Sequence, residues 1–427
     1  MHQDDPLIGR GLEQGAALFR QWFSTLDAAA RRGESAAYVF VMGSVAELLR
    51  SFDLPLVFPE INSLQTAVRR VAHEYLDEAE DYGYSPDICA YVKADVGLQM
   101  RGGAHPMGRV PKPSLAVLTN ACNTYIKWAE IWERMYGTPV FTIDVPGTRR
   151  PDRVTWPGDP DFERDRSYVV QQLRELIPVC EQITGRTYDA ERLRDNLAAT
   201  NVMTAGFRRV LELNKNHPAP FNSVTDGTIY LGVANGLRGT PEAGQYFAAL
   251  EEEMRHKADR GIGTLREERY RLAFVGVPCY PMFRRFNEMF TEWGGTFVTS
   301  TYLWFASGGA AMGWQHEMAD DPLDTLAEDL LVGVRQAMDN MFFADIALDE
   351  MAQGFDLDGV VFHSVKSCRT VSTGLADARR AFSDRHDIPS LFLESDMMDR
   401  RVVSEAQMKN RVDAFFEGMA SRRGALR

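Results

Sequence analysis

Three cysteines occupy positions from which their thiols can meet in one site. Cys122 and Cys368 each follow a short apolar run typical of a buried strand, and Cys89 lies in a loop just beyond Ser85-Pro86. The three are far apart in the sequence, so only folding can bring them together. Thiolate is the soft ligand that iron–sulfur clusters require. A cubane held by three cysteines leaves one iron without a protein ligand, and that iron can contact a substrate.

The same residues are also compatible with ordinary core packing. Buried free cysteine behaves as a small apolar residue and is common in protein cores. Cys180 shows this pattern, because Leu173 and Ile177 lie on nearly the same face of its predicted helix. Cys279 follows a strand-like run, and its surroundings leave its role open. The residue pattern alone therefore permits both cluster binding and core packing for the first three cysteines.

Polar residues at other strand ends are further candidates. Glu60 directly follows the apolar run 54–58, where a carboxylate can transfer a proton. The alternative is a first-turn or N-cap acid for a helix that begins near Ser63. Ser44 follows the run 37–41 and is expected to cap a helix starting at Val45.

Four more polar residues are expected to have structural or solvent-exposed roles. Lys366 is predicted to be solvated, and His363 to be a hydrogen-bonded core or edge histidine. Asp396 and Asp399 follow the last strand-like run and are expected to make turn and cap bonds.

Composition and missing motifs exclude several functions. The net charge of −13 disfavours non-specific nucleic-acid binding, which requires a basic surface. No apolar stretch approaches ~20 residues and no signal peptide is recognisable, so we expect no membrane association. Five cysteines in 427 residues are typical of a cytoplasmic chain with reduced thiols. No Gly-Lys dipeptide exists, so the chain has no Walker A loop, and it contains no Cys-x-x-Cys motif.

Short apolar runs separated by helical patterns predict an α/β fold with parallel sheets. The predicted strands are 37–41, 54–58, 115–118 and 140–143 in the first third, and 271–275, 296–299, 359–362 and 390–393 in the last third. Helices are predicted over 64–82 and 323–343, the latter including Met338, and from Ser404 onward, where a capping box begins.

The middle of the chain differs from both ends, because its periodicity is mostly helical. We therefore predict an α/β domain over 1–160 with two of the cysteines, a mainly helical segment over 161–265, and an α/β domain over 266–427 with the third. The two α/β domains are expected to be Rossmann-like or flavodoxin-like.

Four segments resemble a known family, the benzoyl-CoA reductase and (R)-2-hydroxyacyl-CoA dehydratase subunits. They are PEINSLQ at 59–65, YGYSPDICAYVKADVG at 82–97, NACNTYIKWAE at 120–130 and SVKSCRTVSTG at 364–374, within a similarity over about 35–415. The family's three cluster cysteines fall on Cys89, Cys122 and Cys368. The resemblance implies one [4Fe–4S] cluster per chain on these ligands, within two α/β domains plus helices.

The resemblance also implies roles for two other residues. Glu60 matches a glutamate near the substrate in the dehydratases and is the candidate catalytic acid. Ser44 falls close to a family serine and is the candidate substrate contact.

The motif at 59–62 and the chain length resemble one of the two cluster-bearing subunit types of ATP-dependent benzoyl-CoA reductases. These anaerobic enzymes are heterotetramers in which a homologous cluster-bearing subunit helps to hold the acyl-CoA. Separate ATPase subunits use the ATP and pass on electrons from a ferredoxin-type donor. The implied function is therefore dearomatisation of benzoyl-CoA or a related thioester. The alternatives are a subunit of a (R)-2-hydroxyacyl-CoA dehydratase and a non-catalytic electron-relay or scaffold subunit.

Overall fold

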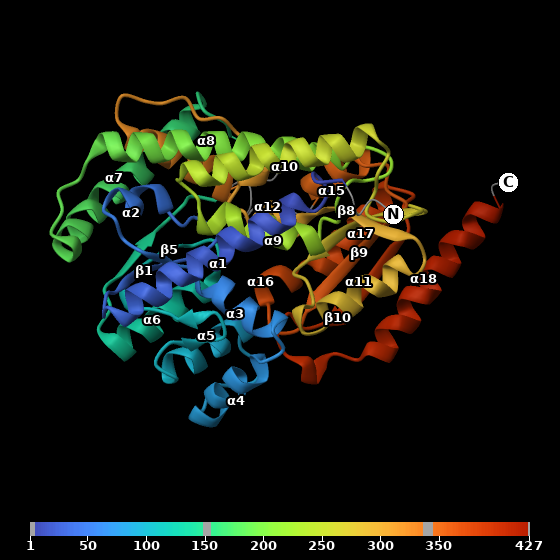
Figure 1. Cartoon of the computed structure of the whole chain (residues 1–427), viewed down its shortest axis with the longest axis horizontal. Coiled ribbons are helices and arrows are strands. Elements are labelled where there is room, and N and C mark those ends of the chain that lie inside the picture. Colours follow the sequence, from blue (N-terminus) through green and yellow to red (C-terminus); the bar gives the residue numbers. More distant parts are fainter. Residues whose placement is uncertain (1–4, 148–154, 336–344, 426–427) are drawn as a thin grey trace.

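The computed structural model of the chain describes residues 5–147, 155–335 and 345–425. Within these residues, two four-stranded parallel sheets form the framework (Figure 1). In spatial order, the first contains β2 (Leu56–Val57), β1 (Ala36–Val39), β5 (Pro113–Thr119) and β6 (Val140–Ile143). The second contains β10 (Ser390–Ser395), β9 (Gly359–Val365), β7 (Tyr270–Gly276) and β8 (Gly295–Ser300). Their central strands are buried along most of their length, as parallel strands covered on both faces should be.

The two sheets share one strand order. When the strands of each sheet are numbered along the chain, they are arranged second, first, third, fourth. The order therefore reverses between β1 and β5 in the first sheet, and between β7 and β9 in the second. Ligands of open parallel sheets bind beyond the carboxyl ends of the strands at such reversal points. The topology thus provides two equivalent places for functional loops.

All eight predicted strands are present and all pair in parallel, so the predicted α/β class with parallel sheets is confirmed. β2 is shorter than the apolar run 54–58, in which Pro55 has no N–H to donate to a neighbouring strand. The division into Rossmann-like domains, with boundaries at 160 and 265, stays a prediction.

Helices and a hairpin connect the strands of the first sheet. They are α2 (Ala46–Ser51), α3 (Pro59–Val68), α4 (Ala72–Tyr82), α5 (Ala90–Met100), the antiparallel pair β3 (Ala104–His105) and β4 (Gly108–Arg109), and α6 (Asn123–Tyr136).

The predicted single helix over 64–82 is wrong, because the chain forms α3 and α4 there. Arg70 separates them with a backbone φ of 64°, a left-handed conformation that interrupts the helix. α3 also begins earlier than predicted, at Pro59, whose missing N–H is tolerated in the first helical turn. Glu60 consequently lies in the first turn of α3.

The described residues between β6 and β7 form helices. They are α7 (Pro160–Thr184), α8 (Ala190–Leu213), α9 (Thr225–Gly236) and α10 (Pro241–Asp259). α8 packs along α10, and the N-terminal helix α1 (Arg10–Arg31) packs against α9 and α10. Figure 1 shows α8 and α10 side by side along one edge of the molecule. The predicted helical character of this segment is therefore observed.

Shorter elements accompany the second sheet. They are η1 (Tyr280–Met282), α11 (Phe283–Thr291), α12 (Thr301–Phe305), η2 (Ala310–Met312), α13 (Pro322–Asp329), the π-helical turn η3 (Leu330–Val334), α15 (Asp345–Gly354), α16 (Arg369–Ser372), α17 (Leu375–Arg385), η4 (Arg400–Val402) and α18 (Glu405–Ala425).

Two helix predictions concern these elements. α18 begins directly after Ser404, as the capping box predicts. α13 and η3 cover the first part of the predicted helix 323–343, whereas Met338 lies outside the described residues. None of the described helices has the length and apolar composition required to cross a membrane.

A buried ionic network joins helices from several parts of the chain. Arg238, which follows α9, donates hydrogen bonds to Glu47 of α2 at 2.8 Å and to Asp329 of α13 at 2.6 Å. These three side chains are nearly inaccessible to solvent. His316 lies 3.0 Å from Asp329. Although burial alone would lower it, hydrogen bonds to Asp329 and Glu328 raise the pKa of His316 to about 9. The network fixes α2, and with it the loop that leaves β1.

Replacing the central cation of this network should destabilise the fold. In Arg238→Met, the Glu47 and Asp329 carboxylates stay buried without their partner, and we expect a loss of about 3–5 kcal/mol in the free energy of unfolding. Urea unfolding at neutral pH measures it. Arg31→Ala, which breaks the exposed pair with Asp27, should change stability by less than about 1 kcal/mol. Equal effects of the two substitutions would contradict a structural role for the network.

Candidate active site

A cavity of about 110 Å³ lies where the carboxyl ends of the two sheets face each other. The loops after β1, β5, β7, β9 and β10 all contribute to its wall, through Val41 and Met42, Cys122, Val277, Cys368 and Met397, respectively. Residues of α1, α3, α5, α6, α9, α12 and α16 complete the wall. The cavity therefore adjoins both points of strand-order reversal, where ligands of parallel sheets collect.

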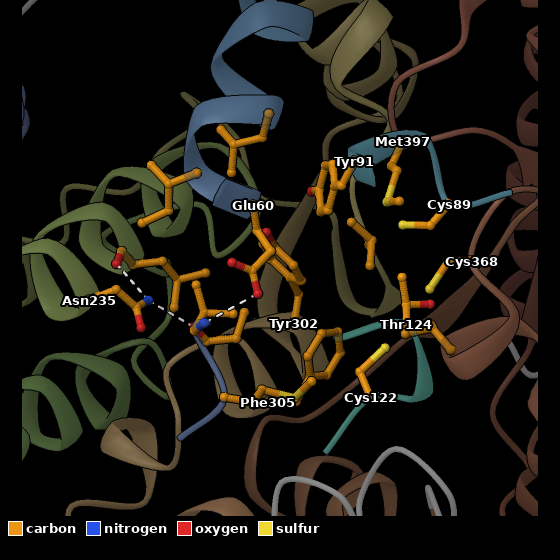
Figure 2. Close-up of a pocket in the computed structure, with 18 of the residues that line it drawn as sticks. Glu60, Cys89, Tyr91, Cys122, Thr124, Asn235, Tyr302, Phe305, Cys368 and Met397 are labelled. Atoms are coloured by element: carbon orange, nitrogen blue, oxygen red, sulfur yellow. Dashed lines mark hydrogen bonds between the residues drawn. The ribbon is translucent and has the colours of Figure 1, made fainter. Parts of the chain in front are cut away.

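All three predicted cluster ligands line this one cavity. Cys122 follows β5 and Cys368 follows β9, which are equivalent strands of the two sheets. Cys89 comes from the loop between α4 and α5. Figure 2 shows the three sulfur atoms gathered on one side of the cavity. The fold thus brings together thiols that are distant in the sequence.

Each of these cysteines is the N-cap residue of a helix. Cys89 precedes α5, Cys122 precedes α6, and Cys368 precedes the single turn α16. Backbone N–H groups at a helix start have no partner within the helix and attract negative charge. The fold therefore presents positively polarised backbone to sulfur atoms that would be anionic as metal ligands.

Burial dominates the protonation of two of these thiols. It raises the pKa of Cys89, and it raises the pKa of Cys368 to about 12. The Cys368 thiol adds to the rise at Cys89, so the two groups lie close enough to repel each other as thiolates. Backbone N–H groups of Val92 and Val371 oppose these shifts. Bound metal would supply the positive charge that keeps such buried thiols deprotonated.

The donor types of this site fit an iron–sulfur cluster. In the described residues, no three His, Cys, Asp or Glu side chains are arranged to hold one metal ion. In an iron–sulfur cluster, by contrast, each cysteine binds a different iron, so the thiols are farther apart. The Cys122 sulfur has Thr370 Oγ1 as a hydrogen-bonding neighbour at 3.4 Å. Three soft donors facing one cavity therefore suit a polynuclear cluster.

Glu60 lines the same cavity opposite the sulfur atoms (Figure 2). Its side chain is 6% exposed, and its Oε1 accepts a hydrogen bond from the Val41 N–H at 3.2 Å. Oε2 is buried and has no hydrogen-bond partner. Burial raises the pKa of Glu60 to about 7, against an opposing interaction with Tyr125. A carboxyl group with this pKa can both donate and accept a proton near neutral pH.

Ser44 does not reach the cavity wall. It is buried in the loop between β1 and α2, beyond Met42, which does line the cavity. The predicted cap is also wrong, because Val45 is the N-cap residue of α2 and no side chain caps this helix. A substrate contact by Ser44 stays a prediction.

The remaining cysteines belong to the core. Cys180 packs within α7 among apolar side chains, as predicted. Cys279 follows β7 much as Cys368 follows β9, yet it packs under the second sheet and does not line the cavity. Position after a strand is therefore insufficient to identify a cavity residue.

The polar residues that were predicted to be structural or solvent-exposed occupy such positions. His363 is buried between the Val277 carbonyl and the Ser395 hydroxyl, at 2.6 Å from each. Lys366 is exposed. Asp396 accepts backbone hydrogen bonds within its turn, and Asp399 caps η4.

The sequence analysis missed the aromatic lining of the cavity. Its members are Phe19, Tyr91, Tyr125, Trp128, Tyr302 and Phe305. A signal existed for two of them, because Tyr91 and Tyr125 lie in the first turns of the helices that Cys89 and Cys122 cap. Tyr302 and Phe305 belong to α12, where nothing in the sequence distinguishes them from core residues.

Known proteins resemble this chain along most of its length. The family described as 2-hydroxyglutaryl-CoA dehydratase, D-component, matches residues 44–419. The B subunit of the benzoyl-CoA reductase of Thauera aromatica is 32% identical over 402 residues, which cover 92% of this chain and 90% of the relative. The (R)-2-hydroxyisocaproyl-CoA dehydratase alpha subunit of Clostridioides difficile is 26% identical, with 88% of each chain covered. The (R)-phenyllactyl-CoA dehydratase alpha subunit of Clostridium sporogenes is 24% identical, covering 89% of this chain and 88% of the relative.

The buried carboxyl group should make stability depend on pH in a defined direction. With a pKa of about 7 in the folded chain and 4.5 as the usual value, folded Glu60 binds its proton more tightly than unfolded Glu60. Stability should therefore fall as pH rises from about 4.5 to 7, by about 3 kcal/mol. Glu60→Gln removes this penalty, so it should unfold at a higher temperature than the unsubstituted chain at pH 8 and at nearly the same temperature at pH 4.5.

Thermal unfolding across this pH range, followed by circular dichroism, measures the effect. The exposed Glu133→Gln serves as the matched control and should behave like the unsubstituted chain at every pH. A Glu60→Gln chain that shows no gain at pH 8 would refute the raised pKa.

Proposed function

The chain belongs to the 2-hydroxyglutaryl-CoA dehydratase, D-component, family, and we propose that it is the cluster-bearing catalytic subunit of an ATP-dependent aromatic acyl-CoA reductase. The reaction would convert benzoyl-CoA or a related thioester into a cyclohexadiene-carboxyl-CoA. The observation that carries this proposal is the convergence of three cysteines, one proton-transferring carboxylate and an aromatic wall on a single cavity.

Cys89, Cys122 and Cys368 would hold one [4Fe–4S] cluster. When bound, this group supplies single electrons at the very low potential that an aromatic ring requires. The protein adjusts such a potential through burial and through hydrogen bonds to sulfur. The backbone N–H groups of Val92 near Cys89 and Val371 near Cys368 are available for such bonds.

The aromatic wall favours a planar, apolar acyl group. Tyr91, Tyr125 and Trp128 approach from α5 and α6, and Tyr302 and Phe305 approach from α12. Offset or edge-on contacts with such rings stabilise a bound aromatic group beyond simple burial. The same side chains exclude water, which would otherwise compete for protons and electrons. This lining supports a ring substrate better than a small hydroxyacyl group.

Glu60 would donate and take up the protons of the reaction. Reduction of a ring adds protons in alternation with electrons, so a group must hold a proton inside the cavity and release it on demand. The unpaired Oε2 of Glu60 and the pKa of about 7 suit this role. A thioester substrate makes the first electron transfer easier, because its carbonyl shares the added charge with the ring.

A dehydratase is the second candidate, since the relatives at 26% and 24% identity are dehydratase alpha subunits. The two functions differ in stoichiometry. A reductase consumes electrons and ATP in every turnover, whereas a dehydratase recycles its electron. The greater similarity to a benzoyl-CoA reductase chain, at 32% identity, favours the reductase. The aromatic wall suits any ring-bearing acyl group, including a phenyllactyl group.

The relatives carry subunit names, which supports a multi-subunit enzyme. We propose a homologous cluster-bearing subunit and separate ATPase subunits as partners, with electrons arriving at the ATPase from a ferredoxin-type donor. The two sheets would then be the cores of two Rossmann-like domains that hold the cluster between them. A non-catalytic electron-relay subunit would need the cysteines but not Glu60.

Removing any one of the three cysteines should prevent cluster assembly. In Cys89→Ala, Cys122→Ala or Cys368→Ala, we expect iron and acid-labile sulfide in the anaerobically purified complex to fall by about tenfold or more, because the loss of even an outer-shell partner weakens metal binding by about 10–100-fold. Cys279→Ala is the matched control and should keep its iron, since its thiol lies in the core. Full iron content in any of the first three variants would exclude that residue as a ligand.

Glu60→Gln should separate catalysis from electron relay. In the assembled complex with ATP and reductant, we expect benzoyl-CoA turnover to fall by about 10²–10⁴-fold with iron content unchanged, because one proton-transfer group is lost. The same assay should also be run with 2-hydroxyacyl-CoAs as alternative substrates. Unchanged turnover would refute the acid–base role and favour the relay. Many turnovers on a hydroxyacyl-CoA for each electron and ATP consumed would favour the dehydratase.

A further inference from the structure

Three tyrosines from different elements meet beside the cavity. Tyr91 belongs to α5, Tyr280 to η1 and Tyr302 to α12, and each is at most 9% exposed. Tyr91 and Tyr302 line the cavity, whereas Tyr280 lies behind Tyr302. Figure 2 shows the Tyr91 and Tyr302 rings in the space between Glu60 and the sulfur atoms. None of the three has a role in the acid–base scheme for Glu60.

The hydrogen bonds of this cluster have a direction. The Tyr280 hydroxyl donates to the Tyr302 oxygen at 2.7 Å. A phenol that accepts such a bond keeps its own hydrogen available for another acceptor. Because Tyr302 lines the cavity, that acceptor can be a ligand atom there.

Tyr91 supplies a second donor. Its hydroxyl oxygen is buried and has no hydrogen-bond partner. Buried polar groups are nearly always paired, so an unpaired hydroxyl at a cavity wall indicates a missing partner. Burial raises the pKa of Tyr302 to about 12, so its hydroxyl stays protonated near neutral pH.

Two other polar groups of the wall already have hydrogen-bond partners. The Asn235 side-chain nitrogen donates to the carbonyls of Leu231 and Ala306. Thr370 pairs with Cys122. Glu60 is an acceptor whenever it is ionised, and its charge acts on Tyr302. The Tyr91 and Tyr302 hydroxyls interact with each other, and a carbonyl oxygen entering this mostly aromatic cavity would meet both as buried donors.

We propose that Tyr91 and Tyr302 together bind the thioester carbonyl oxygen of the acyl-CoA, and that Tyr280 is a positioning residue that orients the Tyr302 hydroxyl. This inference rests on the proposed function. When one electron from the partner-supplied reductant enters an aromatic thioester, negative charge accumulates on the carbonyl oxygen. Preorganised donors aimed at such an oxygen stabilise the charge most strongly where water is excluded. The phenols would thus stabilise negative charge on the thioester oxygen, while Glu60 donates and takes up protons.

Infrared spectroscopy of a bound substrate tests this directly. The anaerobic complex, without ATP or reductant, is mixed with benzoyl-CoA carrying ¹³C at the carbonyl, and the isotope-edited carbonyl stretch is compared with that in solution. Two donors should lower the bound frequency. Tyr91→Phe and Tyr302→Phe should each reverse part of this shift, the double variant nearly all of it, and Tyr280→Phe a smaller part. Tyr82→Phe, at an exposed ring, is the control and should leave the shift intact.

Turnover and iron content complete the test. Each phenylalanine substitution in the cavity should lower kcat by about 10²–10³-fold, as loss of an oxyanion-stabilising donor does, with a smaller change in KM and unchanged iron. A double variant that binds benzoyl-CoA with the full carbonyl shift would overturn the inference. If the double variant does not fold, full shifts in both single variants would overturn it equally.

The result on the unsubstituted complex separates this inference from the proposed function. Binding of benzoyl-CoA with an unshifted carbonyl would overturn the assignment of the tyrosines and leave the reductase proposal standing. No binding of benzoyl-CoA at all would overturn both.

Discussion

The site depends on one geometric constraint, which is that the carboxyl ends of two parallel sheets face the same cavity. The shared strand order places a reversal point in each sheet at this edge. Cys122 and Cys368 follow equivalent strands there, and Cys89 approaches from the start of α5. Because each cysteine immediately precedes a helix, a small shift of either sheet would move both a thiol and the backbone N–H groups that accompany it. The ionic network around Arg238, which fixes α2 behind β1, helps to prevent such a shift.

Burial is the second constraint, and it acts in the same direction on two thiols and one carboxyl group of the cavity. It raises the pKa values of Cys89, Cys368 and Glu60, and so favours their neutral forms. Burial raises the pKa of Asp95 as well, but its carboxylate accepts hydrogen bonds from Trp128 and from Trp132 at 2.7 and 2.8 Å. Oε2 of Glu60 has no such partner. A buried carboxylate with one unpaired oxygen reduces stability, and proteins keep such groups mainly where function needs them.

The sequence predicts the framework well, because strands buried on both faces leave continuous apolar runs that periodicity detects. It also identifies the three cysteines that line the cavity, through the motifs around them more than through their spacing. It fails at Arg70, where a left-handed residue divides a helix, since side-chain patterns carry little information about backbone conformation. It does not single out Tyr302, and it leaves the position of Cys279 open. Whether a residue after a strand faces the cavity or the core depends on the three-dimensional path of its loop. That path cannot be predicted from the residue pattern of a single sequence.

The central claim is that distant thiolates hold one polynuclear iron cluster in this cavity. Anomalous X-ray scattering at the iron absorption edge, from crystals of the anaerobically purified complex, tests it most directly. The account predicts a compact group of iron atoms within bonding distance of the sulfur atoms of Cys89, Cys122 and Cys368. Iron bound elsewhere in the chain, or a cavity in which these sulfur atoms contact only protein, would contradict it.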